Sequence, residues 1–334
     1  MSVTAAQGFR AAGIAAGIKK SGKADLALVV NDGPRAEAAG VFTRNKVKAA
    51  PVLWSQQVLT TGSLRAVVLN SGGANACTGA EGFQVAHATA EQVAEVVGCG
   101  AIDVAVCSTG LIGEQLPRET VLAGVRSAAA ELASGPEAGS AVAAAIMTTD
   151  TVPKESAVTD PAGWTVGGTT KGAGMIAPSM ATMLSVVTTD AVLDRATLDA
   201  ALREAVRYSF DRLDVDGSMS TNDTVLVLAS GASGVEADPA VFTAALTRVC
   251  RDLAEQMQAD AEIDPERLDV TINGVLLCKG AVVAGDRADC DLSGKDVLIE
   301  VELGLSGGAD GHTAEIRTTD LSHAYVEENS AYSS

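Results

Sequence analysis

The chain has 334 residues, of which 47% are apolar and 20% charged, so it can form one large globular domain or two medium ones. Its formal net charge is −18, which argues against a nucleic-acid partner because phosphate binding requires clustered lysine and arginine side chains. No stretch reaches the roughly 18 uninterrupted apolar residues of a membrane-spanning helix, and we expect a cytoplasmic protein.

The first half of the chain alternates short β-rich segments with helical patterns. Strands bounded by turn residues are predicted at 25–30, 38–43, 65–70 and 101–113. Helical spacing is found at 81–97 and at 118–134. The segment 139–158 then combines a short helix, a Thr/Asp/Pro loop and a strand.

The second half continues this alternation. An amphipathic helix is predicted at 194–213, with Asp194 as its N-cap, and a long helix at 238–262. Strands are predicted at 183–193, 224–230, 268–277 (a pair around an Asn-Gly turn), 296–304 and 313–321. The helices do not regularly connect parallel strands in this interpretation, which favours a layered α+β arrangement over a doubly wound sheet.

The cysteines and histidines show no metal-binding pattern. The six cysteines are scattered without short spacings, and there are only three histidines. We therefore predict no metal and expect reduced thiols buried as small hydrophobic side chains. The acidic loop 214–224 lacks the glycine and the glutamate of a calcium-binding EF-hand, so we interpret it as a structured polar loop.

The segment 171–184, "KGAGMIAPSMATML", is too irregular to be a helix or a strand that only packs. Its glycines partly fit a GxGxxA dinucleotide fingerprint, but Pro178 interrupts the helix that such a fingerprint requires. The glycines could instead supply only turn geometry between two strands. A third interpretation is self-cleavage between Ala181 and Thr182.

Self-cleavage would solve a chemical problem for Thr182. A threonine hydroxyl is a poor nucleophile unless a base lies beside it, and a free α-amino group titrates near 7.7–8.0, close to working pH. Cutting the preceding bond places such an amine on the same residue. Ala181 is small, and Gly172, Gly174 and Pro178 provide a turn-rich approach.

The segment 171–184 closely resembles the processing site of the ornithine acetyltransferase family, the bifunctional glutamate N-acetyltransferases of arginine biosynthesis. The resemblance spans nearly the whole chain in order. It includes "AAGVFTRNKVKAAPV", "LNSGGANACTG", "CSTGLIG", "IMTTDTVPK", "STNDTVL", "QADAE" and "TTDLSHAYVEENSAYSS". It implies an α+β sandwich of the ornithine acetyltransferase and DmpA-like type, with a self-cleaving N-terminal threonine nucleophile.

By this resemblance, Thr182 takes the acetyl group from N2-acetylornithine and passes it to glutamate, giving ornithine and N-acetylglutamate. Thr109 and Gly110 match the pair that stabilises the oxyanion. Lys171 matches a substrate-binding lysine, whose ammonium could pair with the α-carboxylate that both substrates share. Thr148 matches a substrate-contacting threonine, although the sequence does not separate it from Thr149.

Further substrate-binding positions are matched by Glu262, Asn329 and Ser334, the last two in a C-terminal tail that folds back onto the active site in this family. The resemblance implies an α chain of residues 1–181 and a β chain of residues 182–334, assembled as an α2β2 heterotetramer. It implies no cofactor when acetylornithine is the donor, with acetyl-CoA as a possible second donor.

The chain departs from the family immediately after Glu262. The family continues there for several tens of residues, whereas Ile263 follows directly here, so an internal deletion is expected. The deletion lies beside a predicted substrate residue. Two alternatives to the acetyltransferase stay open: an N-terminal-nucleophile aminopeptidase or amidohydrolase of the same structural class, and a remnant of the acetyltransferase that the deletion has inactivated.

Overall fold

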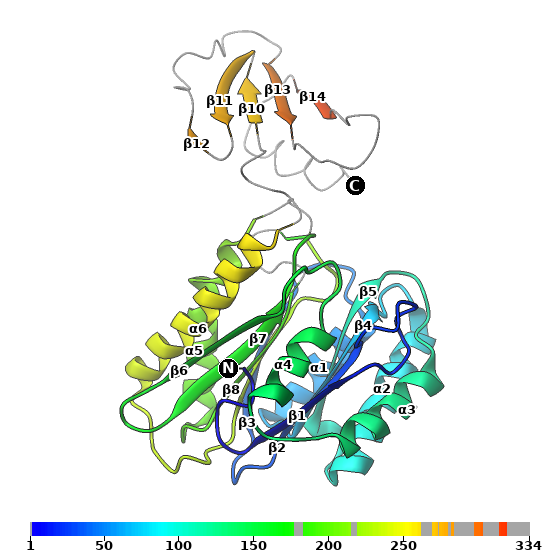
Figure 1. Ribbon diagram of the computed structural model, residues 1–334, viewed down its shortest axis with the longest axis vertical. Coiled ribbons are helices and arrows are strands. Elements are labelled where there is room, and N and C mark those ends of the chain that lie inside the picture. The colour runs from blue at the N-terminus through cyan, green and yellow to red at the C-terminus, as the bar shows by residue number, and fades with distance from the viewer. Residues whose placement is uncertain are drawn as a thin grey trace.

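The computed structural model describes residues 2–176, 183–214 and 219–261, and the segments 269–272, 274–279, 282–283, 297–302 and 314–318 (Figure 1). The first three segments form two stacked β-sheets with helices on both outer faces. Within the described residues, no helix is long and apolar enough to cross a membrane.

The first sheet has four strands in the order β1-β2-β4-β5. They are β1 (Phe9–Ile14), β2 (Leu26–Asn31), β4 (Ala66–Gly73) and β5 (Val104–Leu111). All pairs are antiparallel except β4 and β5, which run parallel and are connected through helix α2 (Gly79–Val97). Every residue of β2 is buried, as expected for a central strand that is covered on both faces.

The second sheet has five strands in the order β3-β9-β8-β7-β6. They are β3 (Glu37–Phe42), β6 (Lys154–Thr159), β7 (Thr165–Lys171), β8 (Leu184–Thr189) and β9 (Thr224–Ala229). The parallel pair β8 and β9 is connected through α5 (Arg195–Arg207). Helices α2 and α5 therefore form parallel crossovers, while the other strand pairs of the two sheets are antiparallel, so helices do not regularly connect parallel strands.

Alternate side chains of the strands enter three cores, and this explains the layered arrangement. In β9, Leu226 and Leu228 pack between the two sheets, whereas Val225 and Val227 pack under α5 and α6 (Pro239–Ala259). A third core lies between the first sheet and the helices α2 and α3 (Arg118–Ala130). The predicted layered α+β sandwich is therefore confirmed (Figure 1).

Two shorter helices complete the sandwich. Helix α4 (Pro136–Ala145) adds Val142 and Ala145 to the core between the sheets, and α1 (Ala50–Val58) packs against β5. Three short 3₁₀ turns are η1 (Leu59–Thr61), η2 (Ala101–Asp103) and η3 (Phe210–Arg212).

The remaining strands form a separate antiparallel sheet in the order β12-β11-β10-β13-β14. They are β10 (Asp269–Ile272), β11 (Val275–Lys279), β12 (Val282–Val283), β13 (Val297–Glu302) and β14 (Ala314–Thr318). Strands β10 and β11 flank Gly274 of the predicted Asn-Gly turn, and β13 pairs with β14.

Four cysteines, Cys77, Cys99, Cys107 and Cys250, are free thiols, but they are not uniformly buried. Cys107 and Cys250 are buried, and burial raises the pKa of each thiol to about 12. Cys99 is half-buried and Cys77 is exposed, so the prediction of buried thiols was wrong for Cys77. Its backbone has a φ of 58°, in a tight turn before α2 that leaves the side chain in solvent.

Candidate active site

One end of the second sheet gathers polar groups from several strands. The register Lys171↔Leu184 places the end of β7 beside the start of β8, and Leu184↔Thr224 places the start of β9 next to it. Strand β6 begins at the same edge, since Lys154 pairs with Thr170. The segment 172–183, which contains the predicted cleavage point, thus leaves and rejoins the sheet at this edge. We call this edge the strand-end site.

Lys171 is the central cation of the strand-end site. Its side chain is 2% exposed, and its Nζ donates a hydrogen bond to Oγ1 of Thr148 and lies 3.5 Å from Oγ1 of Thr109. Burial lowers the pKa of Lys171, whereas the nearby Asp150 carboxylate opposes this shift. Three residues predicted from separate motifs therefore meet. Thr148 makes this contact, while the side chain of Thr149 is exposed.

Asp150, which the sequence analysis missed, organises the atoms around Lys171. Its Oδ1 accepts from the Gly172 N–H at 2.6 Å and its Oδ2 from the Thr148 N–H at 3.0 Å. Its Oδ2 also lies 3.6 Å from Nζ of Lys171. Burial alone would raise the pKa of Asp150, but the ammonium groups of Lys171 and Lys154 outweigh it and hold that pKa at about 2.

A fully buried lysine extends this charge network to the end of α6. Lys154 has no exposed surface, and its Nζ donates to Oδ1 of Asp150 at 2.7 Å and to Oδ2 of Asp260 at 2.5 Å. Asp260 also accepts from the N–H and the hydroxyl of Thr151. The alternation of positive and negative groups makes it possible to bury these charges together. Asp260 lies two residues before Glu262.

The predicted oxyanion residues lie at the end of β5. Thr109 is buried, and Gly110 has a φ of 128°, in a region that side chains rarely adopt. A Cβ added at Gly110 would lie 2.6 Å from the backbone of Gly72 and Gly73, so only glycine fits. The close pairing of β4 and β5 therefore fixes the backbone beside Thr109.

A second group of polar residues ties the two sheets together at this edge. The Nδ2 of Asn222 donates to the carbonyl oxygens of Ala74 at 2.6 Å and of Ser108 at 2.8 Å. The next residue, Asp223, accepts the Met183 N–H at 3.0 Å. Burial raises the pKa of Asp223 to about 8, although this N–H, the hydroxyls of Ser220 and Thr43, and Lys171 all act to lower it.

Several predicted residues lie outside the described part of the chain. These are Ala181, Thr182, Glu262, Asn329 and Ser334. The boundary between the predicted chains 1–181 and 182–334 also lies there. Sequence analysis missed four residues of this part of the structure: Asp150, Lys154, Asp223 and Asp260. All four lie inside the motifs that carry the family resemblance, so these motifs were the signal that could have identified them.

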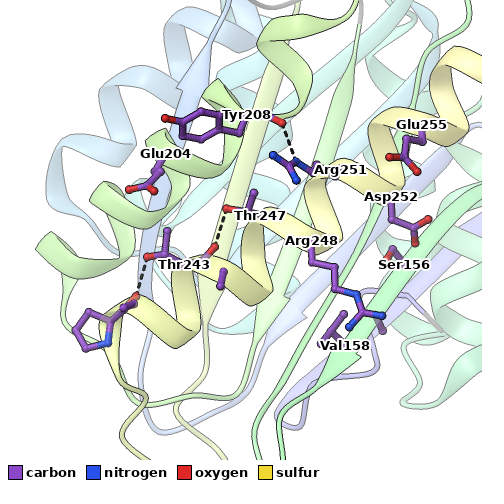
Figure 2. A pocket seen from close by; sticks show the side chains of 14 residues that line it. Ser156, Val158, Glu204, Tyr208, Thr243, Thr247, Arg248, Arg251, Asp252 and Glu255 are labelled. Atoms are coloured by element: carbon purple, nitrogen blue, oxygen red, sulfur yellow. Dashed lines mark hydrogen bonds between the residues drawn. The ribbon is translucent and has the colours of Figure 1, made fainter.

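A separate hollow lies elsewhere on the surface. It is a groove of about 950 Å³ lined by residues of α5, α6 and β6. Figure 2 shows its side chains, with the Nε of Arg251 donating to the Tyr208 carbonyl oxygen at 3.1 Å. We call it the α6 groove. It contains none of the residues of the strand-end site, and its charged side chains carry both signs.

The sandwich is the fold of a variant of the Ntn hydrolases. The L-aminopeptidase D-Ala-esterase/amidase from Ochrobactrum anthropi, described in those terms, matches with a TM-score of 0.51. That match covers 78% of this chain and 86% of that chain at 14% identity, so it shows the fold alone.

The chain itself belongs to the ArgJ family, whose model matches residues 10–263 and 259–334. It is 54% identical to the arginine biosynthesis bifunctional protein ArgJ of Mycolicibacterium paratuberculosis, over 99% of this chain and 96% of the relative. A structure of ornithine acetyltransferase from Mycobacterium tuberculosis, complexed with ornithine, matches at 64% identity with a TM-score of 0.53. It covers 53% of this chain and 95% of that chain. The predicted family and acyltransferase class are thereby confirmed.

The same comparisons locate the predicted deletion. The alignment to the M. paratuberculosis relative runs over 393 positions and so exceeds the 334 residues of this chain by 59. The family model matches in two pieces that meet at residues 259–263, around Glu262. This chain therefore lacks a segment that its relative has, immediately after α6 and the buried Asp260 contact.

Proposed function

We propose that this chain transfers an acetyl group from N2-acetylornithine to glutamate through an acetyl-Thr182 intermediate, as a step of arginine biosynthesis. The observation that carries the proposal is the buried Lys171 ammonium, held beside the hydroxyls of Thr109 and Thr148 at the edge where the segment 172–183 begins and ends. The names of the ArgJ relative and of the ornithine-bound acetyltransferase support the same reaction.

Lys171 would bind the α-carboxylate of either amino acid. Buried charges interact strongly because little water screens them, so one fixed ammonium can hold an anion despite the net charge of −18. Lys19 adds a second positive charge nearby, since its Nζ donates to the carbonyl oxygen of Met147 at 2.7 Å. Asp150 pairs with Lys154 as well as with Lys171, so its single negative charge does not neutralise both ammonium groups. Lys171 can therefore bind a second anion, the carboxylate of the substrate.

The chemistry would proceed in two halves. The Thr182 hydroxyl attacks the acetyl carbonyl carbon, its proton passes to the α-amine of Thr182, and the amine of ornithine leaves with that proton. The amine of glutamate then attacks the acetyl ester and restores the hydroxyl. Each half passes through an oxyanion, which the Thr109 hydroxyl and the Gly110 N–H would stabilise.

The α-amine of Thr182 becomes available only after cleavage between Ala181 and Thr182, so we include self-cleavage in the proposal. The match to the M. tuberculosis structure supports it. That chain aligns with 53% of the 334 residues here, about 177, which is close to the 181 residues of the proposed first chain. We further propose the α2β2 assembly of the cleaved chains, a cytoplasmic location, and acetyl-CoA as a second acetyl donor. The word bifunctional in the relative's name supports the second donor.

The test is an acetyl-transfer assay on the purified chain with N2-acetylornithine, in the presence and absence of glutamate. The proposal predicts ornithine release that depends on glutamate, with N-acetylglutamate as product. Glutamate-independent release of ornithine and acetate would indicate an amidohydrolase instead. No turnover from a correctly cleaved chain would indicate that the missing segment after Glu262 has left an inactive remnant.

A further inference from the structure

Lys19 lies beside the strand-end site and is bonded to the same segment as Lys171. Its Nζ donates hydrogen bonds to the carbonyl oxygens of Met147 at 2.7 Å and of Ala24 at 2.8 Å. Met147 directly precedes Thr148, whose hydroxyl accepts the hydrogen bond from Lys171. The ammonium groups of the two lysines are therefore joined through a single peptide link, which keeps them at most about 10 Å apart.

The segment that carries Lys19 has a fixed position. Asp25 has no exposed surface, and its carboxylate accepts the backbone N–H groups of residues 16–19 at 2.6 to 3.2 Å. A Cβ added at Gly72 would lie 3.1 Å from Cγ of Lys19, so the lysine stem lies against the end of β4. Gly72 in turn pairs with Gly110 of β5. Lys19 is therefore held against the strands that form the predicted oxyanion site.

Lys19 forms no ion pair with a carboxylate within the described part of the chain, since its Nζ bonds to carbonyl oxygens. The neighbouring network contains Lys154 and Lys171 together with the carboxylates of Asp150 and Asp260. With Lys19, this part of the site holds three ammonium groups but only two carboxylates that pair with them. The excess of ammonium groups favours the binding of an anion.

The ammonium groups of Lys19 and Lys171 also act on each other. Burial is the main cause that lowers the pKa of Lys19, the Asp25 carboxylate opposes this shift, and the Lys171 ammonium adds to it. An anion bound between the two lysines would offset both the burial of their charges and the repulsion between them.

The two amino acids of the proposed reaction differ at the end of the side chain. Ornithine ends in an ammonium group and glutamate in a carboxylate. The α-amine of glutamate must be unprotonated to attack, so the reacting glutamate carries two negative charges. Its carboxyl carbons lie about 5 Å apart when extended, so two ammonium groups up to about 12 Å apart can each bond to one carboxylate. The separation of Lys19 and Lys171 lies within that limit.

We propose that Lys19 selects glutamate as the acetyl acceptor, by binding the γ-carboxylate of glutamate while Lys171 binds its α-carboxylate. This role rests on the acetyl transfer proposed above and names the residue that separates the two amino acids. The side-chain ammonium of ornithine meets the Lys19 ammonium instead, and the like charges repel. Lys19 thus favours the exchange of ornithine for glutamate on the acetylated enzyme.

The experiment compares the purified full chain with Lys19→Met, which keeps an apolar stem and removes the ammonium group. Acetyl transfer from N2-acetylornithine is measured with glutamate or with glutamine, which has the same length but a neutral amide. In such a two-step transfer, kcat/KM for each substrate reports only the half-reaction that this substrate enters. Lys20→Met is the matched control, because Lys20 is the next residue and is exposed.

We expect the parent to prefer glutamate over glutamine by at least about 10-fold in kcat/KM, the scale that separates a hydrogen bond to a charged group from one to a neutral group. In Lys19→Met, kcat/KM for glutamate should fall by at least about 10-fold. The value for glutamine should change little, and the value for N2-acetylornithine should not fall. Lys19→Arg should retain most of the preference, and Lys20→Met should behave as the parent.

A similar fall for all three substrates in Lys19→Met would show that Lys19 only positions the segment around Thr148, and its role in selection would be overturned. Values equal to those of the parent would overturn it as well. If Lys19→Met does not fold, judged by circular dichroism, the parent decides, because equal kcat/KM for glutamate and glutamine also overturns the role. A parent that transfers no acetyl group to either acceptor contradicts the proposed function itself, and the role of Lys19 fails with it.

Discussion

The strand-end site and the α6 groove differ in the environment of their polar groups. The groove has a volume of about 950 Å³, its charges lie near solvent, and two of its hydroxyls bond within α6, Thr243 to the Pro239 carbonyl and Thr247 to the Thr243 carbonyl (Figure 2). At the strand-end site, two lysines are almost completely buried. Burying charge is expensive, so its presence indicates chemistry more strongly than the volume of a hollow does.

The largest expected effect comes from the residue proposed to react. Thr182→Ala should abolish both cleavage and acetyl transfer, because it removes the one hydroxyl that serves both. Thr182→Ser keeps a hydroxyl and is the control. Intact mass and the transfer assay measure the two effects, and an uncut but fully active Thr182→Ala protein would refute the assignment.

Lys154→Met tests whether the buried charges hold the strand-end site together. The substitution leaves Asp150 and Asp260 buried without their shared cation, which should cost about 3–5 kcal/mol of unfolding free energy. Denaturant unfolding measures it, with the exposed Lys20→Met as control. A loss no larger than that of the control would mean that the network contributes little to the fold.

Thr109→Ala tests the oxyanion assignment. Loss of one donor should slow cleavage and acetyl transfer by about 10²–10³-fold while the chain stays folded, because Thr109 contributes only a hydroxyl near Lys171. Thr109→Ser should retain most of the rate. Kinetics on both variants check this, and equal rates for the parent and Thr109→Ala would exclude the hydroxyl as a donor.

Asp150 makes a smaller, pH-dependent contribution to stability. Its pKa in the folded chain, about 2, lies below the ordinary value of 3.8, so its stabilising effect is present above about pH 4 and is lost as pH falls towards 2. A shift of this size corresponds to about 2 kcal/mol. The difference in unfolding free energy between the parent and Asp150→Asn should therefore shrink across that window. A difference that does not change with pH would contradict the ion pairs.

The α6 groove should show the smallest effect. Arg251→Ala removes an exposed side chain that bonds only to the Tyr208 carbonyl oxygen among the described residues. We expect a change in unfolding free energy within about 0.5 kcal/mol and unaltered acetyl transfer. A large loss of acetyl transfer would show that the α6 groove, and not only the strand-end site, takes part in the reaction.

The sequence predicted most elements but missed β1, β7, the two-residue β12 and α1. Helix α5 was predictable because Asp194 caps it by accepting the Thr197 N–H at 2.9 Å. Helix α1 has no side-chain cap and only Pro51 to mark its start. Strand β1 is short and rich in alanine, so its pairing with β2, rather than its own pattern, makes it a strand.

The strand-end site was predictable only through the family resemblance. Lys171 and Thr109 are 62 positions apart, and Lys154 and Asp260 are 106 apart, so no local spacing could pair them. A buried lysine also contradicts the usual preference of lysine for the surface. The sandwich brings these residues together because β6 starts at the edge of the sheet where β7 ends, and this edge lies close to the end of β5.

The most direct test of the account is intact-mass spectrometry of the purified chain after incubation with N2-acetylornithine in the absence of glutamate. The account predicts two fragments, residues 1–181 and 182–334, with one acetyl group, about 42 Da, on the second fragment alone. Added glutamate should remove that acetyl group. An uncut chain, or a second fragment that never gains an acetyl group while turnover proceeds, would contradict the central role of Thr182.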